Sequence, residues 1–109
     1  MEIPDHPFQL TDWNAIPATV YQGITGTATW KTIFMGPTRI RMVEYSPGYL
    51  ADHWCSKGHI LFCFEGELHT ELADGREFIL TPGTSYQVAD NAESHRSHTK
   101  TGAKLFIVD

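Results

Sequence analysis

Three histidines and one cysteine have the side chains and the spacing that a transition-metal site needs. His53 and Cys55 are separated by one residue, and His59 follows soon after Cys55. His95 comes from a distant part of the chain. Imidazole and thiolate groups bind zinc, iron, nickel or copper in preference to calcium or magnesium. We therefore predict a site for a divalent transition metal (zinc, iron or nickel), with these ligands: His53, Cys55, His59 and His95.

The ligands are expected to converge inside a barrel. Alternate residues of a strand point to the same face, so a strand through Leu50–Trp54 would turn His53 and Cys55 the same way. His59 begins the next strong strand pattern, and His95 comes from a further strand. Cys55 has two other interpretations, because it could lie beside the metal or be a small buried residue.

Three further residues are candidates for the surroundings of the metal. Asp52 could accept a hydrogen bond from His53 or a neighbour and orient it, or it could be a solvated loop carboxylate. Tyr86 lies on the strand pattern that leads toward His95 and could reach the cavity. Cys63 has the face parity of His59, so we expect it to point into the barrel and to be buried.

Short strand patterns between turns predict an all-β fold. Runs rich in Val, Ile, Thr, Tyr and Phe alternate with glycine and proline turns, a spacing typical of β-sandwiches and β-barrels. Asp12 could cap one short helical turn at Trp13–Ile16. We expect about ten strands, which include residues 25–34, 40–45, 50–54, 59–65, 68–72, 76–80, 85–88, 95–99 and 104–108.

Composition limits the partners and the compartment. The chain has 109 residues, a formal charge of −5, and eight Lys and Arg residues that are scattered along it. Nucleic-acid binders are usually basic, so neither nucleic acid nor an anionic membrane is an expected partner. The sequence has no long apolar run and no secretion-signal pattern, so we expect a cytoplasmic protein. Two cysteines do not make a disulfide framework.

The stretch from Gly48 to Gly66 resembles the first sequence motif of the cupin superfamily. In that motif a glycine is followed by His-x-His, then by a glutamate and a second glycine. The resemblance implies that His53 and His95 are metal ligands, that Cys55 replaces the second histidine, and that His59 replaces the glutamate. The second motif is less complete, because Asp90-Asn91-Ala92 stands where Pro-x-Gly is usual.

A narrower resemblance is to a small bacterial cupin group named for a DHCW motif. Asp52-His53-Trp54-Cys55 carries those four letters, and Lys57-Gly58-His59-Ile60 is similar as well. The resemblance implies an RmlC-like double-stranded β-helix, or jelly-roll, barrel. We expect a single cupin domain over residues 1–109, with roughly residues 1–20 as an N-terminal arm or strand.

Three functions are compatible with these residues. The first is a metal-dependent enzyme, such as an oxygenase or isomerase, that acts on a small molecule and keeps an open coordination position. The second is a non-catalytic binding module with a closed metal site. The third is a metal-independent isomerase in which a histidine acts as general base.

We also expect a homodimer, because Ile60, Phe62 and Phe64 form an apolar strand face, unless an N-terminal strand covers it.

Overall fold

The computed structural model describes residue 3 and residues 5–109, and within that range it has nine strands and one short helix. No helix in the described range is long and apolar enough to cross a membrane. The all-β prediction is confirmed. The elements are η1 (Trp13–Ala15), β1 (Thr19–Gln22), β2 (Thr27–Met35), β3 (Thr38–Tyr45), β4 (His59–Gly66), β5 (Leu68–Leu72), β6 (Glu77–Leu80), β7 (Thr84–Val88), β8 (His95–His98) and β9 (Ala103–Val108).

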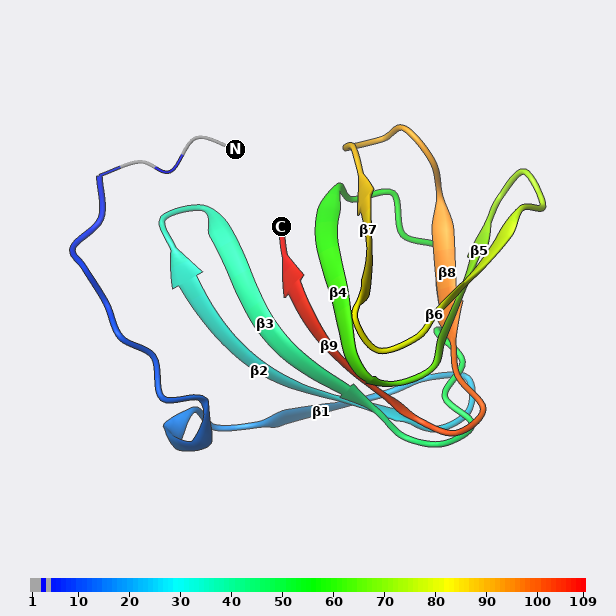
Figure 1. Ribbon diagram of the computed structural model, residues 1–109, viewed down its shortest axis with the longest axis horizontal. Helices are drawn as coiled ribbons and strands as arrows, with labels where there is room; N and C mark the ends of the chain where they lie inside the picture. The colour runs from blue at the N-terminus through cyan, green and yellow to red at the C-terminus, as the bar shows by residue number, and fades with distance from the viewer. Residues whose placement is uncertain (1–2, 4) are drawn as a thin grey trace.

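The strands form two antiparallel sheets that face each other. One sheet has the order β1-β2-β3-β9-β4-β7, and the other has the order β6-β5-β8. Figure 1 shows them as the two walls of an open barrel, with the end of β9 between β3 and β4. The predicted double-stranded β-helix, or jelly-roll, barrel is confirmed.

The core lies between the two sheets and follows the alternation of the strands. Leu61 and Cys63 of β4 and Leu105 of β9 are almost fully buried, and they pack with Leu68 of the opposite sheet. Burial of each large apolar side chain contributes about 1.5–3 kcal/mol. The expected burial of Cys63 is confirmed, and its thiol donates to the carbonyl oxygen of Glu65 at 3.5 Å.

The predicted strand Leu50–Trp54 is wrong. Leu50 makes isolated bridges to Thr25 and to His98, and Cys55 makes one to His95. The segment crosses between the two sheets, so its backbone bonds go to several partners and no continuous ladder forms. Strand parity therefore does not set the directions of the His53 and Cys55 side chains.

The N-terminal part of the chain begins as an extended arm. Residues 5–12 contain no helix or strand and lie away from the barrel (Figure 1). Asp12 accepts a hydrogen bond from the backbone of Asn14 and caps η1, as predicted. The ring of Trp13 then packs edge-on against Phe106 on β9, with 6.4 Å between the ring centroids. Met1, Glu2 and Pro4 of the expected arm lie outside the described residues.

Candidate metal centre

Two side chains that are close in the sequence, Cys55 and His59, meet the distant His95 at one end of the barrel. The ligand atoms of Cys55, His59 and His95 all lie within 4.8 Å of one another. His59 is the first residue of β4, and His95 is the first residue of β8 in the opposite sheet. The predicted convergence is confirmed for these three side chains.

Backbone contacts hold Cys55 beside His95. The amide of Cys55 donates to the carbonyl of His95 at 2.8 Å, and the amide of His95 donates back at 2.9 Å. A second hydrogen bond holds the loop between Cys55 and β4, because the amide of Gly58 donates to the Asp90 carboxylate at 2.7 Å. A Cβ at Gly58 would lie 2.5 Å from the backbone nitrogen of Asp90, so this close approach requires glycine.

The ring of His95 is buried and oriented by the backbone. Its Nδ1 lies 2.9 Å from the carbonyl oxygen of Glu93, and only 2% of the residue is exposed. A carbonyl oxygen can only accept, so Nδ1 carries the hydrogen. In the neutral ring Nε2 therefore has a free lone pair, which is the form that a metal ligand needs.

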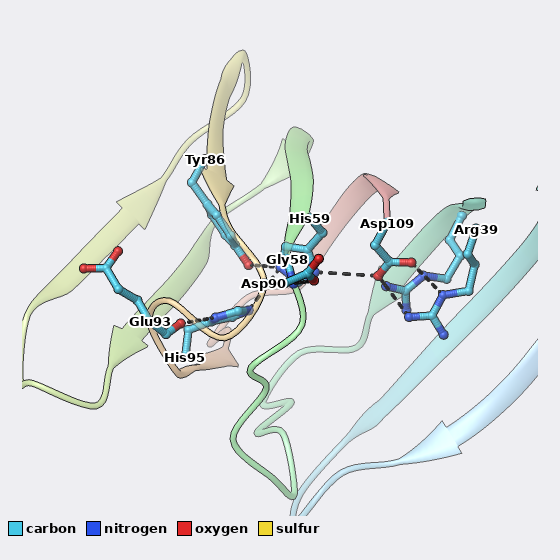
Figure 2. A network of polar contacts seen from close by, with 9 residues as sticks. Arg39, Gly58, His59, Tyr86, Asp90, Glu93, His95 and Asp109 are labelled. Atoms are coloured by element: carbon cyan, nitrogen blue, oxygen red, sulfur yellow. Dashed lines mark hydrogen bonds and ion pairs between the residues drawn. The ribbon is translucent and has the colours of Figure 1, made fainter. Parts of the chain in front are cut away.

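His59 presents a second nitrogen to the same point. Its Nε2 lies 3.1 Å from Nε2 of His95 and 2.9 Å from the hydroxyl of Tyr86 (Figure 2). Two nitrogens that each bind one ion at about 2.1 Å are separated by about 3–3.4 Å, so the spacing fits a shared ion.

The other nitrogen of His59 faces a carboxylate. Nδ1 is buried without a hydrogen-bond partner among the described residues, and Oδ2 of Asp109 lies 3.7 Å from it. Metal-binding histidines usually donate their second N–H to a carboxylate or carbonyl group. Asp109 is therefore placed to orient His59.

Burial keeps His59 and Tyr86 in their neutral forms. Desolvation, with the neighbouring His95 as the next cause, lowers the pKa of His59 to about 4. At neutral pH the ring is uncharged and has a lone pair for a metal. Desolvation also raises the pKa of Tyr86, so its hydroxyl keeps its proton.

His53 does not join the group of three. Its side chain is 74% exposed, and Nδ1 donates to the Asp52 carboxylate at 2.6 Å. The ring lines the same cavity, so a metal-binding role for His53 stays a prediction. Asp52 accepts this hydrogen bond and is 59% exposed, so both of its interpretations fit and its role at the metal stays a prediction. Cys63 lies in the core rather than at this cavity, because it is further along β4 than His59.

The sequence analysis did not identify three residues at the site: Arg39, Arg41 and Asp109. The register of the sheet places Arg39 of β3 opposite Asp109, which follows β9, and the two backbones exchange hydrogen bonds. The Asp109 carboxylate accepts from Arg39 at 2.8 and 2.9 Å and from Arg41 at 3.0 Å. Figure 2 shows Asp109 between His59 and Arg39. One signal was available, because Arg41 has the parity of the apolar Val43.

The site opens on a cavity of about 130 Å³ inside the barrel. Cys55, His59, His95, Tyr86, Arg41 and Asp109 are among its lining residues. A larger hollow of about 410 Å³ lies near Glu44 and Lys104, but no histidine or cysteine lines it. The smaller cavity is therefore the candidate site.

Solved structures with the same fold are numerous, although no family model and no curated protein matches the sequence. An RmlC-like cupin from Shewanella frigidimarina superposes with a TM-score of 0.69 at 20% identity, over 95% of this chain and 89% of that one. A cupin-superfamily sugar phosphate isomerase from Silicibacter pomeroyi gives 0.72 at 17% identity, over 92% and 74%. The chain has a cupin fold. The Fe(II)-HppE enzyme gives 0.76 at 17% identity, over 96% of this chain and 61% of that one.

The donor set of this site suits a transition metal. Two imidazoles and one thiol meet, and the backbone fixes the tautomer of His95. Soft sulfur and borderline nitrogen donors favour zinc, iron and nickel over calcium or magnesium. Membership of the DHCW group stays a prediction.

Proposed function

We propose that this cupin is a metal-dependent enzyme that acts on a small molecule inside its barrel. Cys55, His59 and His95 would hold the ion, with zinc, iron or nickel as the expected metals. The convergence of these three donors at an internal cavity carries the proposal. Catalytic zinc sites keep three protein ligands and one open position, whereas structural sites close with four. Since His53 lies outside the group, the donor set favours an enzyme over a closed binding module.

Residues around the donors have separate tasks in this proposal. Asp109 orients His59, and the Glu93 carbonyl orients His95. The hydroxyl of Tyr86 retains its proton and lies at the ligand atoms, so it can donate a hydrogen bond to an oxygen of the substrate. A bound metal would supply Lewis-acid polarisation or an activated water.

Elemental analysis tests the metal requirement. Untagged protein purified without chelator is expected to contain about one zinc, iron or nickel ion per chain. Cys55→Ser should lower that content, whereas Lys100→Gln, which changes an exposed side chain, should not. Metal-free wild-type protein that also fails to take up these ions would contradict the proposal and favour a metal-independent cupin.

A ligand-binding test separates an enzyme site from a closed site. Cobalt-loaded protein should change its visible absorption when azide is added, because azide can take an open position on the ion. An unchanged spectrum, together with stoichiometric cobalt, would indicate a closed module and overturn the enzymatic part of the proposal.

A homodimer in the cytoplasm is also part of the proposal. Ile60, Phe62 and Phe64 of β4 are 42%, 39% and 38% exposed, and Phe8 of the arm is 99% exposed. An apolar sheet face and an apolar arm on one chain can cover each other in a pair. Both described cysteines are free thiols, as a reducing compartment would keep them. Phe78 of β6 is 49% exposed on the other sheet and serves as the control. Light scattering should give a dimer for the wild type and for Phe78→Glu, but a monomer for Phe62→Glu. Dimers of both variants would contradict this interface.

A further inference from the structure

The cavity beside the candidate metal centre is positively charged, although the chain as a whole is acidic. Arg39 and Arg41 line it, and Asp109 is its acidic lining residue. Arg96 also lines it, but the guanidinium of Arg96 pairs with Glu71 and lies over the Trp54 ring. The whole chain has a formal charge of −5. Two guanidinium groups, those of Arg39 and Arg41, share the single carboxylate of Asp109 beside this cavity. An anion that enters would therefore be attracted.

Arg41 has more hydrogen-bond donors than its partners use. It is 5% exposed and donates one side-chain hydrogen bond, to Oδ2 of Asp109 at 3.0 Å. Its Nε is buried and has no partner among the described residues. A guanidinium carries five N–H donors, and a buried donor without a partner is costly. The side chain is therefore incomplete without a further acceptor.

Asp109 cannot supply that acceptor alone. Arg39 already occupies both carboxylate oxygens of Asp109, and Arg41 shares one of them. Burial, followed by the like charge of Arg39, lowers the pKa of Arg41, so the two causes together outweigh the single carboxylate. A second carboxylate would satisfy the open donors and balance the charge.

The remaining walls suit an organic molecule of small size. The Trp30 ring covers Arg41, with 4.2 Å from Cζ to the ring centroid, and Leu61 and Ile107 add apolar surface. The volume of about 130 Å³ equals that of about four waters, at ~30 Å³ each. An acid of about four to six non-hydrogen atoms would fill it.

We infer that the substrate of this site is a small organic acid, whose carboxylate pairs with Arg41 and whose other end faces Cys55, His59 and His95. The inference rests on the proposed function, and it adds the chemical class of the substrate. Asp109 lies between the two ends, since it contacts Arg41 and faces His59.

Titration of metal-stripped protein with acetate and propionate tests the carboxylate subsite apart from the metal. Propionamide, which has the shape of propionate without its charge, is the matched ligand control. Calorimetry should show at least about tenfold tighter binding of propionate than of propionamide. Arg41→Gln should weaken propionate binding by about 10–100-fold, whereas Lys100→Gln should leave it unchanged.

A measurement on the wild type avoids dependence on the folding of Arg41→Gln. The Nε–H resonance of Arg41 should shift in a ¹⁵N NMR spectrum as propionate is added. An unmoved resonance, or equal binding of propionate and propionamide, would overturn the inference. Tighter binding of inorganic phosphate than of either carboxylate would overturn the substrate class.

The two proposals fail in different ways. Propionate binding at Arg41 in a chain that takes up no metal would leave the carboxylate subsite standing and remove the enzyme proposal. Propionate binding that needs the metal and survives Arg41→Gln would keep the metal site and remove the subsite, because the carboxylate would then be on the ion.

Discussion

Two histidine pairs in this chain have the same ring separation but different surroundings. The ring centroids of His59 and His95 are 4.8 Å apart, and so are those of His69 and His98. The first pair joins β4 of one sheet to β8 of the other, inside the barrel. The second pair joins neighbouring strands, β5 and β8, on the face opposite the buried Thr70 and Ser97.

A third donor and the direction of the nitrogens distinguish the pairs. Cys55 joins His59 and His95, and their Nε2 atoms meet at 3.1 Å. His69 instead turns Nε2 to the Glu67 carboxylate at 2.8 Å. Within residues 3 and 5–109, Cys55, His59 and His95 are the group of three whose donors converge. Close rings are therefore insufficient, and convergent lone pairs are what indicate a site.

Removing one ring from each pair should give the largest difference in metal content between two variants. His95→Ala removes a buried ligand, so the metal content should fall from about one ion per chain to below about 0.1 after dialysis. His98→Ala should retain about one ion per chain. Elemental analysis of both variants measures this, and equal losses would remove the distinction between the pairs.

Changing the carboxylate beside each pair should give a smaller difference, which is measured as zinc affinity. Asp109→Asn removes the negative charge that faces Nδ1 of His59, so zinc affinity should fall about 10–100-fold in a competition titration with a chelator. Glu67→Gln, which changes the partner of His69, should leave the affinity within about threefold. Circular dichroism should first establish that Asp109→Asn is folded, because Arg39 and Arg41 also lose a charged partner. An unchanged affinity in folded Asp109→Asn would contradict the orienting role.

Acid should destabilise the metal-stripped protein through His59 of the His59–His95 pair. The pKa of His59 is lowered to about 4 in the folded state, from about 6.5 in an unfolded chain. Between these values the unfolded chain binds more protons, so stability falls as the pH drops from about 6.5 to about 4. We expect His59 to contribute about 2 kcal/mol to this loss, after allowing for water in the cavity. Urea unfolding of His59→Gln should show a shallower pH dependence, and an identical one would contradict the assignment.

A histidine outside both pairs should give the smallest effect. His53 is exposed and bonded to Asp52, so His53→Ala should change metal affinity by less than about threefold. A chelator competition titration checks this. A loss as large as that of His95→Ala would show that His53 moves onto the ion and becomes a fourth ligand.

Most of the fold followed from local patterns in the sequence. Alternation in residues 59–65 and 104–108 marked β4 and β9, because their inner residues are apolar and buried. The segment Leu50–Trp54 has the same kind of local pattern and is not a strand. Its pairing depends on crossing between sheets, which is a tertiary property that no local period encodes.

The site was predictable only where residue type alone indicates chemistry. Cys55, His59 and His95 stood out as ligand types, and the structure brings them together. His53 was grouped with Cys55 by strand parity, and that parity failed with the strand. Asp109 and Arg39 meet His59 through the register of β3, β9 and β4, which only the assembled sheet defines.

X-ray absorption of the zinc-loaded protein tests the central claim most directly, because it identifies the atoms bound to the ion. The account predicts one sulfur at about 2.3 Å and imidazole nitrogens at about 2.0–2.1 Å, with the sulfur lost in Cys55→Ser. A wild-type spectrum without a sulfur neighbour, or without imidazole scattering, would contradict the ligation by Cys55, His59 and His95.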